Sequence, residues 1–176
     1  MTSAVLRNTF PSMVDLHLVS APAEMAKSKG STAVDVLLAV RHPLLSSSLR
    51  QLLDAEQDIE VIGEADDLGA TLRGLDAELP HVLVVDLGML GGSAGETIGK
   101  LRARAPESQV VLLTMDDSPL VAQHLLGCGA RGFVLKDRAD DELACAVRAA
   151  ARGGEYLSPG VARRLDRALR RSVVPA

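Results

Sequence analysis

The chain has 176 residues, a size that suits one domain with extensions. Its formal net charge is −4, so the chain as a whole has no electrostatic attraction for nucleic acid or for an anionic membrane. Apolar residues make up 47% of the sequence, but no apolar run is long enough to span a membrane. Only Phe10, Phe133 and Tyr156 are aromatic, so the core must be built from aliphatic side chains.

Two cysteines, Cys128 and Cys145, are too few for a disulfide framework and stand in apolar surroundings. We expect both to be small core residues in a reducing compartment. Asp15 and His17 interrupt any apolar stretch near the N-terminus, so we read no secretory leader there. We predict a cytoplasmic protein with no membrane partner.

The hydrophobic pattern divides the chain into three parts. Residues 1–32 show no sustained period and are predicted to be a flexible extension. Residues 33–154 alternate between strand and helix signals and form the predicted domain, and residues 155–176 form a predicted linker helix and tail. In the tail, Asp166 stands among five arginines, so we interpret these as a solvated helix face, with nucleic-acid binding as the alternative. The five are Arg163, Arg164, Arg167, Arg170 and Arg171.

Within the domain, five apolar runs of strand length each precede an amphipathic helical pattern. The runs cover residues 34–40, 59–62, 82–86, 110–114 and 132–135, and the helices begin at Pro43, Asp66 or Asp67, Ser93, Pro119 and Ala139. Five such units predict an α/β fold with a doubly wound, five-stranded parallel sheet in the order 2-1-3-4-5. The switch point, where such sheets bind ligands, then lies between strands one and three.

Three polar residues stand at the carboxyl ends of neighbouring strands. Asp86 ends strand three, Thr114 ends strand four and Lys136 follows strand five. A carboxylate, a hydroxyl and an ammonium group at one sheet edge favour phosphoryl transfer to the carboxylate, with the other two contacting the phosphate. Each residue alone has an ordinary interpretation, since Asp86 can cap a helix, Thr114 can end a strand and Lys136 can be a solvated charge. Their joint placement is harder to obtain by chance.

At this point the sequence resembles a known family. The segments that carry the resemblance are His42-Pro43-Leu44, Gly63-Glu64-Ala65, Val84-Val85-Asp86-Leu87, Gly127-Cys128-Gly129-Ala130-Arg131-Gly132-Phe133, Leu135-Lys136-Asp137 and Tyr156-Leu157-Ser158-Pro159. Over about residues 34–165 the chain is similar to response-regulator receiver domains of the NarL/FixJ subfamily, which have a flavodoxin-like, CheY-like fold. The resemblance implies a signalling module without enzymatic turnover. It also implies that a histidine kinase phosphorylates Asp86 and that Thr114 and Phe133 move together as a switch pair.

The sequence departs from the family where its members hold Mg²⁺. Val40-Arg41 stands in place of two adjacent acids, Leu90 in place of a proline and Ser93-Ala94 in place of Asp-Gly. Mg²⁺ requires oxygen ligands in nearly octahedral geometry, so we predict no cofactor and lost or weak Mg²⁺ binding. We expect Arg41 to occupy the place of the metal and to pair with Asp86.

These departures predict an atypical receiver that switches independently of phosphorylation or with little metal, and that regulates transcription through an output domain absent from the chain. Two alternatives stay open: an ordinary receiver phosphorylated on Asp86, and a pseudo-receiver that senses a small molecule. A flavin- or nucleotide-binding domain is disfavoured, because no glycine-rich phosphate loop follows strand one. The expected partners are a second copy of the chain, joined through the first and last receiver helices, and either a histidine kinase or a small-molecule ligand. DNA is expected to bind only through the missing helix-turn-helix domain.

Overall fold

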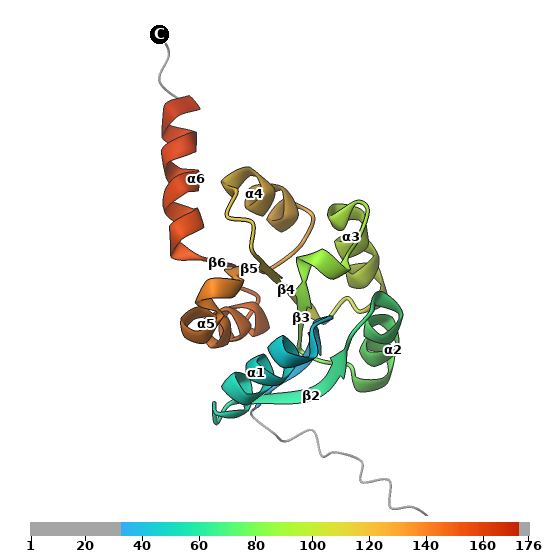
Figure 1. Ribbon diagram of the computed structural model, residues 1–176. Helices are drawn as coiled ribbons and strands as arrows, with labels where there is room; N and C mark the ends of the chain where they lie inside the picture. Colours follow the sequence, from blue (N-terminus) through green and yellow to red (C-terminus); the bar gives the residue numbers. More distant parts are fainter. Residues whose placement is uncertain (1–32, 173–176) are drawn as a thin grey trace, which may run out of the picture. The chain divides into compact units, whose positions relative to one another are not determined.

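The computed structural model describes residues 33–172, with side chains through Arg170 (Figure 1). The predicted N-terminal extension and the last four residues lie outside the described part. The strands are β1 (Val34–Ala39), β2 (Ile59–Ala65), β3 (Val82–Asp86), β4 (Gln109–Thr114), β5 (Gly132–Leu135) and β6 (Tyr156–Leu157). The helices are α1 (Pro43–Asp54), α2 (Leu68–Glu78), α3 (Ala94–Arg104), α4 (Pro119–Gly127), α5 (Ala139–Ala151) and α6 (Pro159–Ser172), with short 3-10 helices η1 (Leu87–Met89) and η2 (Lys136–Arg138).

The strands form one parallel sheet in the order β2-β1-β3-β4-β5-β6. The first five follow the predicted order, but the predicted number of five strands is wrong. β6 pairs with β5, with Gly132 opposite Tyr156 and Phe133 opposite Leu157. A strand of two residues is too short to show the alternation on which strand prediction depends, so the sequence pattern did not reveal it. The sheet therefore continues past Gly154, where the domain was predicted to end.

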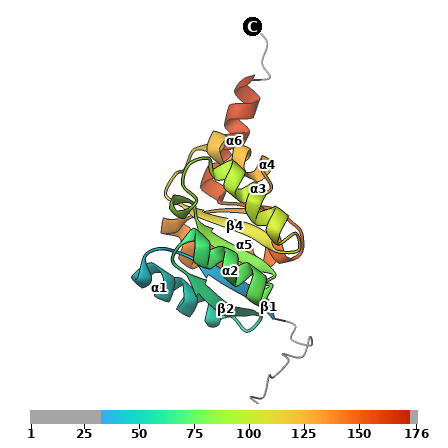
Figure 2. The same ribbon diagram turned by 90° about the vertical axis from the view of Figure 1, so that its right-hand side faces the viewer.

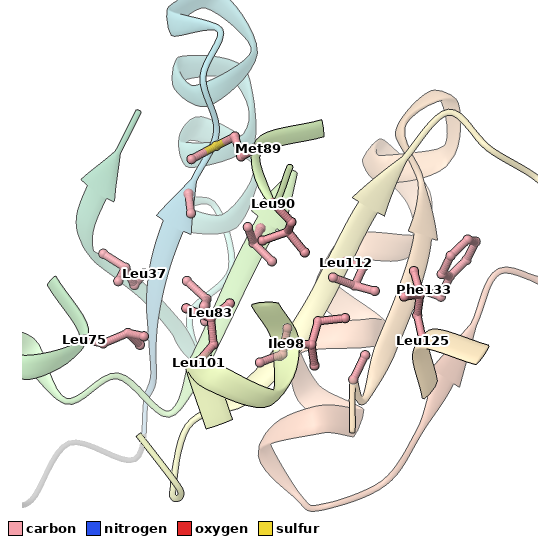
Figure 3. Packing of buried hydrophobic residues seen from close by; sticks show 14 of the residues in the cluster. Leu37, Leu75, Leu83, Met89, Leu90, Ile98, Leu101, Leu112, Leu125 and Phe133 are labelled. Carbon is pink, nitrogen blue, oxygen red and sulfur yellow. The ribbon is translucent and has the colours of Figure 1, made fainter. Parts of the chain in front are cut away.

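Helices cover both faces of the sheet, as the doubly wound fold requires (Figure 2). Because successive side chains of a strand point to opposite faces, Leu37 of β1 joins one core cluster and Val36 and Leu38 join the other. The first cluster includes buried residues of α2, α3 and α4, such as Leu75 and Ile98 (Figure 3). The second is completed by buried residues of α1 and α5. Both cores are almost entirely aliphatic, as the composition predicts.

The two cysteines differ in burial. Cys128 is half-buried and packs against the first core cluster, whereas Cys145 is exposed on α5, so the prediction of a core position is wrong for Cys145. Cys145 lies between the buried positions Leu143 and Ala146, on the side of the helix that faces away from the sheet. In the described part of the chain, no helix has the length and apolar character needed to cross a membrane.

Candidate functional site

Asp86 is the last residue of β3, and its carboxylate is held by two donors. Lys136 Nζ donates to Asp86 Oδ2 at 2.7 Å, and the backbone N–H of Gly88 donates to Asp86 Oδ1 at 3.0 Å. The side chains of Asp86 and Lys136 are 7% and 19% exposed. The structure therefore brings together these two predicted residues as a largely buried ion pair, in which the lysine balances the charge of the carboxylate.

The loop after Asp86 is fixed by apolar packing and by two glycines. Asp86 caps η1, while Met89 and Leu90 are buried beneath the loop. Gly91 and Gly92 then adopt φ values of 57° and 40°, a left-handed conformation that glycine tolerates without steric cost. Asp86 thus caps η1, as its ordinary interpretation predicted, and pairs with Lys136 at the same time.

Thr114 and Phe133 lie at different depths beside this pair. Thr114 ends β4 and is 5% exposed, and its Oγ1 accepts the N–H of Asp116 at 3.0 Å. Phe133 is fully buried in the first core cluster and lies opposite Leu112, whereas Thr114 lies opposite Leu135. The hydroxyl is therefore near the edge of the sheet and the ring is packed in the core. Their joint movement as a switch pair stays a prediction.

Comparisons with known proteins agree with this geometry. The family described as "Response regulator receiver domain" matches residues 36–148. The chain belongs to the response regulator receiver family. It is 36% identical over 131 residues to the transcriptional regulatory protein MctR of Rhizobium johnstonii, covering 73% of this chain and 60% of MctR. It is 35% identical over 132 residues to the nitrate/nitrite response regulator NarP of Escherichia coli, covering 74% of this chain and 61% of NarP.

A solved structure gives the same result at the level of the fold. The structure of two RcsB dimers bound to two parallel DNAs matches with a TM-score of 0.68 at 28% identity, covering 76% of this chain and 68% of RcsB. The curated relatives, which are named as response regulators or transcriptional regulatory proteins, identify the chain as a NarL-type receiver of two-component signalling. The chain spans about 60% of the length of the curated relatives MctR and NarP.

Arg41 does not take the position expected for it. Its side chain is exposed, and no ion pair or hydrogen bond joins it to Asp86. It instead lines a pocket on the β2 side of β1, together with Glu64 and Asp66. The predicted Arg41–Asp86 pair is therefore absent. Lys136 already balances the charge of the buried Asp86 carboxylate. The Arg41 guanidinium remains hydrated because it stays exposed to solvent.

The residues of this receiver do not fit Mg²⁺. At the end of β1, where a metal site would need carboxylates, Val40 is 2% exposed and apolar, and Arg41 is cationic. Within the described residues, no group of three or more His, Cys, Asp or Glu side chains is placed to hold a metal ion. Mg²⁺ prefers six oxygen ligands, and Asp86 contributes its oxygens to Lys136 and Gly88 instead. That Mg²⁺ binding is lost stays a prediction.

The pocket beside Arg41 involves residues that the sequence analysis did not assign. It has a volume of about 370 Å³ and is lined by Val40, Arg41, Pro43, Ser46, Glu64, Ala65 and Asp66. Ser46 Oγ donates to Glu64 Oε2 at 2.6 Å, and Arg50 donates to Glu64 Oε1 at 2.7 Å. The hydrogen bond from Ser46 has the larger effect and that from Arg50 the next, and together they hold the pKa of Glu64 below its usual value. Ser46 and Glu64 are 18 residues apart, and no local motif connects them.

Ser158 connects the start of α6 to β5, the strand that directly precedes Lys136. Its side chain is 1% exposed, and its Oγ accepts the N–H of Leu135 at 3.0 Å and donates to Glu142 on α5. The N–H of Ser158 also donates to the carbonyl of Phe133 at 2.9 Å. Leu135 directly precedes Lys136, which pairs with Asp86. Ser158, at the start of α6, therefore bonds to the residue next to the partner of Asp86. The sequence analysis singled out this segment only for its family resemblance.

Proposed function

We propose that this chain is an atypical receiver that signals without Mg²⁺-dependent phosphorylation of Asp86. In this proposal it regulates transcription through an output domain outside the chain. One observation carries the proposal: the Asp86 carboxylate is neutralised by Lys136, while the end of β1 offers an apolar and a cationic side chain where oxygen ligands are required.

The chemical reason is the charge that a metal supplies in phosphoryl transfer. When a carboxylate attacks a phosphoryl group, two anionic groups must approach each other, and a divalent cation normally balances them. Lys136 offers a single positive charge, which already stabilises the free carboxylate. The barrier to transfer is therefore expected to be too high for ordinary signalling.

The same contacts suggest how the receiver switches. An event that separates Lys136 from Asp86 would shift the end of β5, and Ser158 would pass that movement to α6 through Leu135. Arg41 takes no direct part in this step, because it has no contact with Asp86. Its charge acts only by disfavouring a cation at the end of β1. A histidine kinase is not needed for this form of switching.

We also propose that the receiver acts as a homodimer through α1 and α5. The similarity to RcsB, whose dimers have been solved on DNA, supports this interpretation. The two helices lie on the same face of the sheet and contact each other. Sedimentation velocity tests it, because a chain that stays monomeric at high micromolar concentration rejects the dimer.

Two alternatives have support from specific observations. Asp86, Thr114 and Lys136 retain the residue types of a phosphoacceptor site, which favours an ordinary receiver with a relaxed metal requirement. The pocket of about 370 Å³ favours a small-molecule sensor, since the Arg41 guanidinium on its wall has no hydrogen bond or ion pair with another described residue.

Titration with Mg²⁺ separates the proposal from the ordinary receiver. We expect millimolar Mg²⁺ to leave the melting temperature unchanged, because a ligand that does not bind adds no stability. The matched variant Val40→Asp/Arg41→Asp should gain a saturable increase. A saturable increase in the unmodified chain that disappears in Asp86→Ala would reject the proposal.

A further inference from the structure

The arginines of α6 gather on one side of the helix. With about 100° between successive residues, Arg163, Arg167 and Arg170 fall within roughly 60° of one another. Arg164 lies beside them, roughly 60° from Arg167, and all four side chains are exposed. We call Arg163, Arg164, Arg167 and Arg170 the basic face of α6.

Asp166 borders this face and does not divide it. It lies roughly 40° from Arg170 and roughly 100° from Arg167 around the helix axis, at the edge of the arginine cluster. Arg170 Nε donates to Asp166 Oδ2 at 2.9 Å, an ion pair between exposed side chains four residues apart. Ion pairs between exposed side chains contribute little to stability, so this one can open when a stronger anion binds.

The opposite side of α6 is turned toward the rest of the receiver. Val161 is fully buried in the first core cluster, and Leu165 is half-buried. α6 packs against α4, and Arg164 forms an ion pair with Asp117 in the loop before α4. Figures 1 and 2 both show α6 extending past α4. The basic face is therefore presented to solvent by a helix whose position is fixed by its apolar side.

Two arginines of this face are available for a ligand. The side chains of Arg163 and Arg167 are exposed and form no hydrogen bond or ion pair with another described residue. They are one helical turn apart, and the whole basic face covers about 10 Å along the helix axis. Guanidinium groups match phosphate oxygens with two parallel hydrogen bonds, which makes an arginine row suited to a line of phosphates.

We propose that the basic face of α6 binds the phosphate backbone of double-stranded DNA without reading its sequence. Duplex DNA carries about one charge per 1.7 Å of its axis, so the arginines find phosphates in any register. A membrane surface fits less well, because an interfacial helix must insert its apolar side, and here Val161 is buried within the protein. The inference rests on the proposed function, in which the regulator acts on DNA, and adds a DNA contact within the receiver chain itself.

The contact is expected to be weak and sensitive to salt. The chain has a net charge of −4, so its remaining surface repels DNA. When the exposed pairs Arg164–Asp117 and Arg170–Asp166 open and all four arginines neutralise phosphates, the affinity should fall roughly 100-fold between about 50 and 200 mM salt. This contact would position the receiver on DNA already bound by an output domain, since phosphate contacts fix register and orientation rather than specificity.

Fluorescence anisotropy with the full 176-residue chain and a labelled duplex of arbitrary sequence tests the proposal. We expect binding at low salt that weakens steeply as salt is added. In Arg163→Gln/Arg167→Gln, about two phosphate contacts are lost, so the same increase in salt should weaken binding only about tenfold. The control Arg73→Gln/Arg138→Gln removes the same charge from two exposed arginines of the receiver body and should keep the original salt dependence.

Three results would overturn the proposal. They are no binding at low salt, equal salt dependence for the two double variants, and tighter binding to polyglutamate or to phosphatidylserine vesicles than to the duplex. Circular dichroism of each variant establishes that it is folded. The test is independent of Asp86 chemistry, because Asp86→Asn should bind the duplex like the unmodified chain even if the receiver proves to be phosphorylated.

Discussion

The ion pair between Asp86 and Lys136 allows a quantitative prediction about stability. Replacing Lys136 with methionine keeps the aliphatic length of the side chain but removes its charge. The Asp86 carboxylate, 7% exposed, would then retain only the Gly88 N–H as a partner. Breaking a buried pair in this way costs about 3–5 kcal/mol, and the 19% exposure of Lys136 places this case near 2–3 kcal/mol. For a chain of this size, that corresponds to a decrease of roughly 5–10 °C in melting temperature.

Replacing Asp86 should destabilise the chain less than replacing Lys136. In Asp86→Asn the amide oxygen still accepts the Gly88 N–H, and the flexible Lys136 can extend its ammonium group into water. We expect a cost of about 1 kcal/mol for this variant and little further cost when Lys136→Met is added to it, because no unpaired charge remains. The two substitutions are therefore predicted to be strongly non-additive.

Urea unfolding of the two single variants and the double variant measures this coupling. A coupling energy of about 2–3 kcal/mol is expected, well above the roughly 0.3–0.5 kcal/mol within which independent sites add. If the costs of the two single variants add up to that of the double variant within this margin, Lys136 does not balance the charge of Asp86.

Two further predictions concern Glu64, which lines the pocket, and Ser158, which connects α6 to β5. Because the bonds from Ser46 and Arg50 lower the pKa of Glu64 in the folded state, its contribution to stability is present above the ordinary pKa and is lost as the pH falls through the lowered one. The unfolding free energy of Glu64→Gln should thus depend less on pH in the acidic range than that of the unmodified chain, and an equal dependence would contradict the prediction. Ser158→Ala should cost about 1–3 kcal/mol by leaving the partly buried Leu135 N–H without its acceptor, and should speed amide hydrogen exchange in α6. Ser48→Ala, at an exposed hydroxyl, is the matched control, and equal effects of the two serine substitutions would contradict the anchoring role of Ser158.

Much of the fold follows from local patterns in the sequence. The third strand is bounded as predicted, from Val82 to Asp86, because its apolar run is continuous and ends at a charged residue. Ser93 and Pro119 mark helix starts through capping and ring geometry, which depend only on neighbouring residues. β6 was missed because two residues carry no pattern, and its place in the sheet depends on pairing with a distant strand.

The site was predictable only where topology alone brings residues together. Asp86 and Lys136 meet because both stand at the carboxyl ends of strands in the same sheet, and the strand order follows from the pattern of units. The direction of a flexible exposed side chain does not follow from topology, so Arg41 was placed on the wrong side of β1. Likewise, the contact between Ser46 and Glu64 depends on the packing of α1 against β2, which sequence spacing does not encode.

Intact-mass spectrometry after incubation with acetyl phosphate and Mg²⁺ tests most directly whether this receiver signals without ordinary phosphorylation. We predict no mass increase for the unmodified chain, and the gain of one phosphoryl group for Val40→Asp/Arg41→Asp, in which the missing carboxylates are restored. A stoichiometric, Mg²⁺-dependent phosphoryl group on the unmodified chain that is absent from Asp86→Asn would contradict the account and establish an ordinary phosphoacceptor.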